Sequence, residues 1–356
     1  MGIKGLKTFL FSKGVTEEIK PLSVLKDKKL ALDAAFLMHR SKNSGQDWLD
    51  ILAACLNYLK RNDIQAVFIF DGVSPPEKMV EKLKRRSNRQ KAIDRLNVLK
   101  SELIDFKESS VEGPVLKKVK SRFADDLQAV EKYACKTLNV EVTPEDVESF
   151  QTLIDAVGFA HLVAPGEAEL YAVKLTASKI TDAVVSFDSD IIAAAACQGV
   201  SKIYTDVNSY GVVEINVDLV LDVLGFEASQ FLDFCILCGT DFNAGVSKIG
   251  PVKAYKALTE YKKLEKVPYD ISHINLDRIR SIFKEQQSSL QIPIFGHFDR
   301  EKVYSLSNIS LTSFLKCVET FEDRTQEIAS SLKKFTLSNM SFNSEQVTDN
   351  ALIVKN

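Results

Sequence analysis

AVVSFDSD, residues 183–190, joins an unbroken apolar run to two aspartates, Asp188 and Asp190. Amphipathic segments such as 48–60 and 145–157 separate it from similar short runs rich in β-branched and aromatic residues. These other runs are KLAL at 29–32, AVFIF at 66–70 and FAHLVA at 159–164. Buried parallel strands have this pattern because helices cover both faces of their sheet. The sequence therefore predicts an α/β fold with a mostly parallel sheet between two layers of helices.

Length and composition are those of a globular protein. The chain has 356 residues, of which 45% are hydrophobic and 26% are charged, which suits about two domains. It contains neither a run of eighteen apolar residues nor a secretory leader, so we expect no membrane segment. The net charge of −2 does not indicate a polyanionic partner, so a nucleic-acid partner can be inferred only from where the charges lie along the chain.

Cysteine and histidine are too dispersed for zinc chemistry. The chain has six cysteines and four histidines, and the one close pair, Cys235 and Cys238, lies in the apolar run FLDFCILCG. No second pair stands at ligand spacing. We interpret these two residues as buried thiols in a protein of a reducing compartment.

Acidic residues follow the predicted strands. Asp33 comes after KLAL, Asp71 after AVFIF, and Asp188 and Asp190 after AVVSF. Because the carboxyl ends of parallel strands meet at one edge of a sheet, we expect these acids to share a site. Further acids expected at the same edge are Glu167, Glu169 and Asp241.

So many carboxylates in one cleft need positive charge. Each uncompensated buried anion would cost several kcal/mol or stay protonated. Divalent cations resolve this, and a ligand set of hard oxygens selects Mg²⁺ or Mn²⁺. A helix cap is the alternative for any single Asp, and for Asp33 alone we would favour it. Three strand-end aspartates together favour a metal site, where two ions about 4 Å apart could catalyse phosphodiester hydrolysis.

A basic insertion interrupts the apolar runs. Residues 78–122 hold fourteen Lys or Arg against six Asp or Glu, densest in KLKRRSNRQK, which includes Lys84 and Arg86. Gly113-Pro114 divides the segment, so we expect two helices joined by a turn. Such helices could bind DNA by neutralising phosphates. A solvated helix pair is the alternative that charge alone leaves open.

Six stretches of the sequence together resemble the 5′ nuclease family of flap endonuclease, exonuclease 1 and the excision-repair 5′ endonuclease. The resemblance covers residues 1 to about 265. The stretches are MGIKGL at the start, the Asp33 strand, IFDGVSPPEK at 69–78, APGEAEL at 164–170, SFDSD at 186–190 and LCGTDFNAGVSKIGPVKA at 237–254.

The resemblance implies a PIN-like, Rossmann-like α/β fold whose acids hold two Mg²⁺ ions, with Mn²⁺ as a substitute. The implied metal ligands are Asp33, Asp71, Glu167, Glu169, Asp188, Asp190 and Asp241, and each position carries a carboxylate. Lys78 and Arg85 look like the arch residues that grip the scissile phosphate, although each could be an ordinary surface cation. Lys78, Arg85, Asp71 and Glu167 are the implied catalytic residues.

The resemblance also implies DNA contacts. GVSKIGPVKA resembles a helix-two-turn-helix element that contacts duplex phosphates, often with a bound K⁺; its candidates are Gly245, Lys248, Gly250 and Lys253. Gly2 would bring a backbone amine near the DNA junction once Met1 is removed. His39 stands where flap endonucleases have a stacking Tyr and exonuclease 1 has His, and YTDVNSYGVVEI at 204–215 also looks more like exonuclease 1.

The expected organisation has five parts. They are the first half of the nuclease core (1–77), a basic helical arch (78–140), the second half of the core (141–225), the helix-two-turn-helix region (226–300), and a C-terminal helical segment with a disordered tail (301–356). The arch is longer than is typical of the family. The tail carries no sliding-clamp peptide, so clamp recruitment is not implied. We expect a monomeric nuclear protein.

The implied activity is Mg²⁺-dependent, structure-specific cleavage of DNA that has 5′ ends, nicks or flaps, in replication or repair. Whether it acts as a 5′–3′ exonuclease or a flap endonuclease stays open. A catalytically inactive scaffold that kept the fold is the alternative, and it would be expected to lose several of the acids. An aspartyl-phosphate mechanism would need an acid where Ala35 stands.

Overall fold

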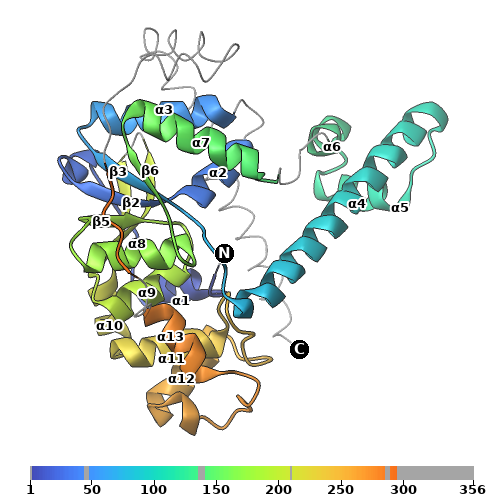
Figure 1. The fold of residues 1–356 in the computed structure, drawn as a ribbon. Coiled ribbons are helices and arrows are strands. Elements are labelled where there is room, and N and C mark those ends of the chain that lie inside the picture. The colour runs from blue at the N-terminus through green and yellow to red at the C-terminus, as the bar shows by residue number, and fades with distance from the viewer. Residues whose placement is uncertain (1, 44–47, 135–140, 209–210, 285–288, 295–356) are drawn as a thin grey trace.

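A computed structural model of the chain describes residues 2–43, 48–134, 141–208, 211–284 and 289–294 (Figure 1). The segment predicted at 301–356 lies outside the described residues. Among the described residues, no helix combines the length and the apolar character needed to cross a bilayer.

A seven-stranded sheet forms the centre of the molecule, in the order β1-β7-β6-β5-β2-β3-β4. Its strands are β1 (Glu18–Lys20), β2 (Lys29–Asp33), β3 (Gln65–Phe70), β4 (Ala160–Val163), β5 (Ala183–Val185), β6 (Lys202–Asn208) and β7 (Gly211–Asn216). Strands β6, β5, β2, β3 and β4 are parallel, and β7 runs antiparallel to both its neighbours. The prediction of a mostly parallel sheet is confirmed.

Alternate residues of the strands point into two separate cores. Ala31, Val67 and Val184 belong to one core, whereas Leu32 and Phe68 belong to the other. The first core is covered by α1 (Leu6–Ser12), α8 (Ala168–Ala177), α9 (Asp190–Gln198), α10 (Val217–Leu224) and α11 (Ala228–Cys238). The second is covered by η1 (Leu22–Leu25), α2 (Ala34–Lys42), α3 (Trp48–Arg61) and α7 (Pro144–Val157), on the opposite side of the sheet in Figure 1. A sheet covered on both faces explains why its strands read as continuous apolar runs.

Local signals in the sequence set the helix ends. Helix α7 begins at a capping box, in which Thr143 accepts from the Asp146 N–H and the Asp146 side chain accepts from the Thr143 N–H. It ends at Gly158, whose φ of 80° is left-handed. The amphipathic segments predicted at 48–60 and 145–157 are accordingly α3 and α7.

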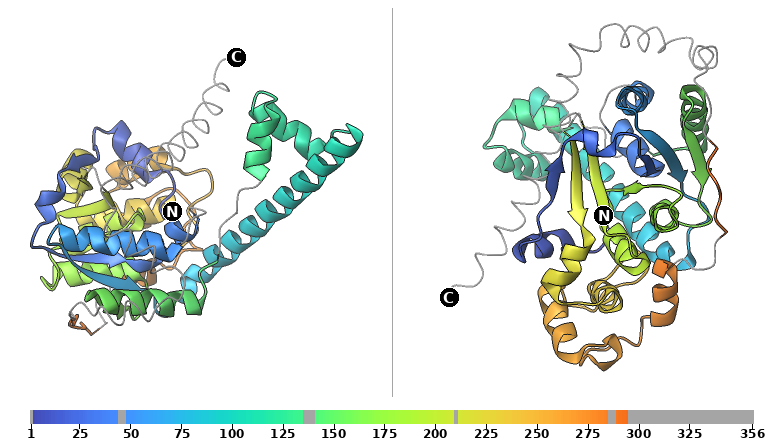
Figure 2. Two further views of the ribbon diagram at one scale, coloured as in Figure 1. Left: turned by 90° about the horizontal axis from the view of Figure 1, so that it is seen from above. Right: turned by 90° about the vertical axis from the view of Figure 1, so that its left-hand side faces the viewer.

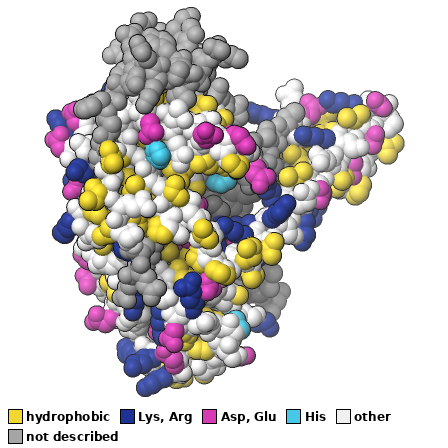
Figure 3. All heavy atoms as spheres, viewed as in Figure 1, with side chains coloured by type: hydrophobic (Ala, Val, Ile, Leu, Met, Phe, Trp, Pro, Cys, Tyr) yellow, Lys and Arg dark blue, Asp and Glu magenta, His cyan; other side chains and the backbone are white. Residues whose placement is uncertain are grey.

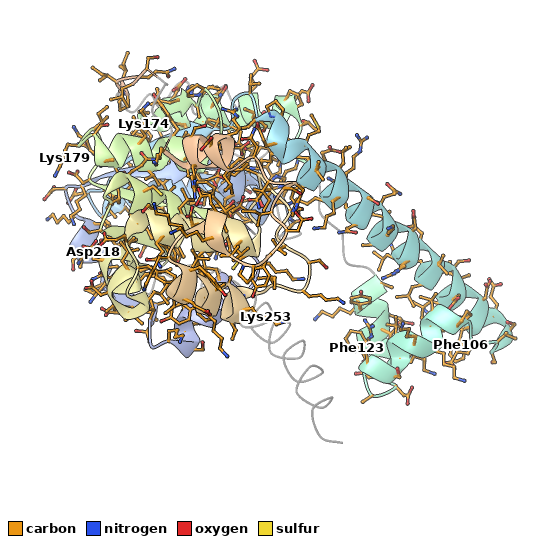
Figure 4. The ribbon with its side chains drawn as sticks, turned by 90° about the horizontal axis from the view of Figure 1, so that it is seen from below. Phe106, Phe123, Lys174, Lys179, Asp218 and Lys253 are labelled. Atoms are coloured by element: carbon orange, nitrogen blue, oxygen red, sulfur yellow. The ribbon has the colours of Figure 1, made fainter. Side chains whose placement is uncertain are left out.

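The basic insertion forms a long helix that leaves the body of the protein. Helix α4 (Met79–Ser109) follows the short helix η2 (Pro76–Lys78) and projects outward, with α5 (Pro114–Arg122) and α6 (Leu127–Ala134) folded back against its far end (Figures 1 and 2). These arch helices share a core of their own, formed by Leu96, Leu99, Leu103, Leu116, Val130 and Ala134. Phe106 and Phe123 lie at this far end (Figure 4). The arch therefore packs independently of the sheet.

The C-terminal part of the described chain packs on the first core. It comprises α12 (Pro251–Tyr261), η3 (Leu264–Lys266) and α13 (Leu276–Lys284), which follow α11. Cys235 in α11 is buried and Cys238 is half-buried against the same core, so the interpretation as core thiols is confirmed. Burial raises the pKa of the Cys238 thiol to about 12, which makes it a poor ligand and nucleophile.

Candidate active site

Asp33, at the end of β2, both caps a helix and belongs to the acidic cluster. Its Oδ1 accepts from the Phe36 N–H at 3.2 Å and so caps α2, while Ser186 Oγ lies 3.4 Å from Oδ2. The capping alternative that the sequence left open is thus correct for this residue. The cap does not remove Asp33 from the acidic cluster, because it occupies only one oxygen.

Asp71, Glu167 and Glu169 come together where β3 and the start of α8 meet. One carboxylate oxygen of each lies within 4.8 Å of the others, and the Ala168 N–H donates to Asp71 Oδ1 at 2.9 Å. Gly72 permits this approach, because a Cβ at that position would lie 1.8 Å from the Ala164 carbonyl oxygen. The glycine of the DGVSPP turn is therefore required by sterics.

Asp188, Asp190 and Asp241 form the other side of the cluster. The Asp190 N–H lies 3.3 Å from Asp188 Oδ1, and the Asp241 N–H lies 3.3 Å from Asp190 Oδ2. Asp190 is fully buried at the start of α9, and Asp241 is buried in the turn after α11. Acids from five separate parts of the chain are thus brought to one edge of the sheet, as the sequence predicted.

Burial and mutual repulsion perturb this cluster. Burial, followed by the charges of Asp71 and Asp188, raises the pKa of Asp33 to about 7. Burial also raises the pKa of Glu169 and that of Asp190 well above their ordinary values, and neighbouring Asp188 adds to both shifts. The cluster therefore resists carrying its full negative charge unless cations are present.

Two cations of the arch base lie against these acids. Lys78 Nζ pairs with Glu167 and lies 3.8 Å from Glu169 and 3.7 Å from Asp241. Burial opposes the charge of Lys78, but Glu169, Glu167 and Asp241 raise its pKa above the ordinary value. Arg85, two helical turns further along, pairs with Asp241. The two residues singled out from the sequence are therefore brought to the acidic edge.

Within the acidic cluster, three buried carboxylate oxygens have no hydrogen-bond partner among the described residues: Glu167 Oε1, Asp190 Oδ1 and Asp241 Oδ2. An unpartnered buried acceptor is costly, so each such atom indicates a missing ligand. The donors are all hard carboxylate oxygens, which fit Mg²⁺ or Mn²⁺. The residues present thus fit a divalent metal site.

Two of the predicted DNA contacts lie beside the cluster. Gly2 has a φ of 77°, and a Cβ there would lie 2.0 Å from Asp188 Oδ1, so the chain start packs directly against a candidate ligand. His39 is exposed on α2, one and a half turns from Asp33. Near it Phe36 stacks on Phe187, with ring centroids 4.1 Å apart.

The predicted helix-two-turn-helix residues form a tight turn between α11 and α12. A Cβ at Gly245 would lie 2.3 Å from the Cys238 carbonyl oxygen, so only glycine fits. Lys253 Nζ donates to the Lys248 carbonyl at 3.2 Å, and Gly250 caps α12. The first N–H groups of α12 point out of this turn, where an anion could bind.

Lys84 and Arg86 are exposed on α4, on a different face from Lys78 and Arg85. Figure 3 shows Lys and Arg side chains gathered where α4 leaves the body and again along the projecting helices. Arg89, which the motifs did not single out, also lies on α4, with its Nη2 3.4 Å from Glu141 Oε2. Its spacing of four residues from Arg85 on one helix was the available signal.

An α/β sheet whose strand ends hold a cluster of carboxylates and two basic side chains defines a class of metal-dependent nucleases. Comparison with known proteins supports the same class. Residues 1–92 match the XPG N-terminal domain and residues 158–241 match the XPG I-region. A RAD2-like endonuclease of Frog virus 3 (isolate Goorha) is 35% identical over 283 residues, which cover 75% of this chain and 78% of that protein. This chain therefore belongs to the XPG and flap endonuclease family and is a hydrolytic nuclease.

Other relatives extend the similarity. Flap endonuclease 1 of Theileria annulata is 27% identical over 94% of this chain and 64% of its own length. Among solved structures, the catalytic core of Rad2 in complex with DNA substrate aligns over 87% of this chain and 95% of its own, at 17% identity and a TM-score of 0.62. The Holliday junction-resolving enzyme GEN1 with product DNA, Mg²⁺ and Mn²⁺ aligns over 81% of this chain and 65% of its own, at 17% identity and a TM-score of 0.51. These two structures show the shared fold.

Proposed function

We propose that this nuclease is Mg²⁺-dependent and cleaves DNA near the junction between a single strand and a duplex, releasing nucleotides or short oligonucleotides from 5′ ends. The observation that carries the proposal is the convergence of seven carboxylates with Lys78 and Arg85 at one edge of the sheet. The GEN1 structure that shares the fold was solved with both metals, which supports the choice of cation.

Two ions would divide this cluster between them. Asp71, Glu167 and Glu169 would hold one, and Asp188, Asp190 and Asp241 would hold the other, with Asp33 between the two groups. Bound there, the ions would supply an activated water and stabilise the oxygens that gain charge during hydrolysis. Metal binding would compete with protons for Asp33, Glu169 and Asp190, because the pKa of each is raised, so the metal should bind more weakly as the pH falls.

Lys78 and Arg85 would exchange carboxylate partners for phosphate when substrate binds. Lys78, at the end of η2, and Arg85, on α4, both reach the acids, so a phosphate at the cluster would lie within their reach. Their cations would orient the scissile phosphate and stabilise charge that develops on it. His39 and Gly2 flank the same place, where His39 could stack on a terminal base.

The duplex would bind at the turn between α11 and α12. The N-terminus of α12 and the side chains of Lys248 and Lys253 provide backbone N–H groups and positive charge for phosphates. Carbonyl groups of the same turn could hold K⁺. The substrate classes we propose are DNA with 5′ ends, nicks or flaps, and the setting is replication or repair, with the protein acting as a monomer in the nucleus.

The choice between exonuclease and flap endonuclease rests on few residues. His39 and the motif at 204–215 favour the exonuclease, whereas the relatives of this chain are named endonucleases. An inactive scaffold is not favoured by any observation, since all seven acids are present.

One experiment tests these proposals together. The protein is incubated with Mg²⁺ and with nicked, gapped, 5′-flap and blunt DNA, each labelled at either end, and product lengths are measured. Mononucleotides from nicks would identify the exonuclease, and whole flaps would identify the endonuclease. Absence of cleavage of every substrate in Mg²⁺ and in Mn²⁺ would refute the proposed function.

A further inference from the structure

Helix α13 is firmly attached to the body of the protein. Its apolar face, formed by Ile279, Ile282 and Phe283, is buried in the first core. Arg280 fastens it further, because its Nε and Nη2 each donate to the Asp233 carboxylate at 2.8 Å. Side chains of α13 therefore start from a fixed backbone.

One side chain of α13 reaches the base of the arch. Arg278 Nε donates to Glu77 Oε1 at 2.9 Å, across 201 residues of sequence. The right-hand view of Figure 2 shows α13, coloured orange, beside the start of α4. The Glu77 side chain is 25% exposed, and its Oε2 is buried without a hydrogen-bond partner among the described residues. Arg278 is therefore the cation that compensates a half-buried carboxylate.

Glu77 is the residue next to Lys78, and both belong to the three-residue helix η2. In this short turn the Lys78 N–H donates to the Pro75 carbonyl at 3.0 Å, so the two side chains leave one rigid piece of backbone. Fixing Glu77 from α13 consequently fixes the point from which Lys78 extends toward Glu167, Glu169 and Asp241.

We propose that Arg278 is a positioning residue for DNA cleavage: its ion pair with Glu77 ties the arch base to α13 and so holds Lys78 against the acidic cluster. This inference rests on the proposed function. Without Arg278, the Glu77 carboxylate would lose its partner and compete with the acidic cluster for Lys78. A partly exposed ion pair adds little to the free energy of unfolding. Its loss should therefore change the position of Lys78, and not the stability of the protein.

A variant that lacks both charges of the ion pair should behave better than one that lacks only Arg278. Removing Arg278 alone leaves a Glu77 carboxylate that can compete for Lys78, whereas removing both charges leaves no competitor. Arg278→Gln should therefore be worse than Glu77→Gln combined with Arg278→Gln. The exchange Glu77→Arg with Arg278→Glu should also restore part of the loss.

The test compares these variants by single-turnover cleavage at saturating protein, by DNA affinity without metal, and by amide hydrogen exchange of residues 76–83 without metal. The matched control is Lys26→Gln, which removes the cation of an ion pair with Asp63 (3.7 Å) at the opposite ends of the strands. We expect Arg278→Gln to lower the maximal rate about tenfold, as a misplaced group does. Affinity should change less than about twofold, and amide exchange at 76–83 should accelerate.

The outcomes are separable. Wild-type rate and exchange in Arg278→Gln would overturn the inference, and so would weakened affinity that the double variant fails to restore, since Arg278 would then contact DNA itself. If the wild type cleaves nothing, the proposed function fails, while hydrogen exchange still decides whether Arg278 holds the arch base. Lys26→Gln should behave as the wild type throughout.

Discussion

Replacing Asp33 with Asn tests the electrostatics of the cluster without catalysis. The folded protein holds the pKa of this carboxyl at about 7, against an ordinary value of 3.8. An acid whose pKa is raised on folding binds its proton more tightly in the folded state. The stability that it contributes is therefore fully present below about pH 4 and is lost as the pH rises toward 7. Asn at this position keeps the helix cap and removes the titration.

The size of the effect follows from the shift. A pKa that moves from 3.8 to about 7 corresponds to about 4 kcal/mol in total, and the part lost between pH 5 and pH 7.5 is about 2.5 kcal/mol. Because the Asp33 side chain is only half-buried, solvent screening reduces this, and we expect about 1 to 2 kcal/mol. The wild type should lose that amount of stability between pH 5 and pH 7.5, whereas the variant should lose none of it, so the variant's advantage should be larger at pH 7.5 than at pH 5 by about 1 to 2 kcal/mol.

Urea denaturation in a chelator at the two pH values measures the difference. Adding Mg²⁺ should stabilise the wild type more at pH 7.5 than at pH 5, because the metal competes with the proton, and should stabilise the variant less. Parallel pH dependence of the two proteins in chelator would refute the reasoning, since it would mean that Asp33 is ionised throughout.

Three further results are expected. Asp188→Asn should abolish cleavage in a gel assay while DNA affinity stays within about threefold, because it removes a metal ligand and no phosphate contact; equal turnover would contradict the assignment. Lys78→Ala should lower the single-turnover rate about 100-fold, whereas Lys84→Ala, on another face of α4, should change it less than about threefold; similar losses would show that only net charge matters. Leu99→Ala, in the core of the arch, should lower the local stability of the arch by about 2 to 5 kcal/mol and make the arch sensitive to proteolysis. The sheet domain should denature as in the wild type, and a shift of its denaturation would show that the arch does not fold separately.

The sheet and the acidic edge could be predicted because both depend on short stretches of sequence. An unbroken apolar run such as AVFIF is buried on both faces, and the residue that follows it must lie at the strand end. Asp71 and Asp188 were found in this way. The edge strand β1 was missed, because three residues with no apolar run acquire strand geometry only by pairing with β7.

Contacts between residues that are far apart in the sequence could not be predicted either. No local pattern links Arg278 to Glu77, since their contact depends on how α13 packs against α9 and on where α4 begins. The strand predicted at 183–187 also ends earlier, at Val185, because the chain turns there to bring Phe187 over Phe36 and Asp188 to the cluster.

The length of α4 has a mechanical consequence. Its 31 residues extend about 46 Å, so a tilt of about 10° at η2 would sweep the far end through about 8 Å. The same tilt moves Lys78, at the pivot, by far less. A tilt of α4 could thus make room for bulky or branched nucleic acids without displacing Lys78 from the acidic cluster.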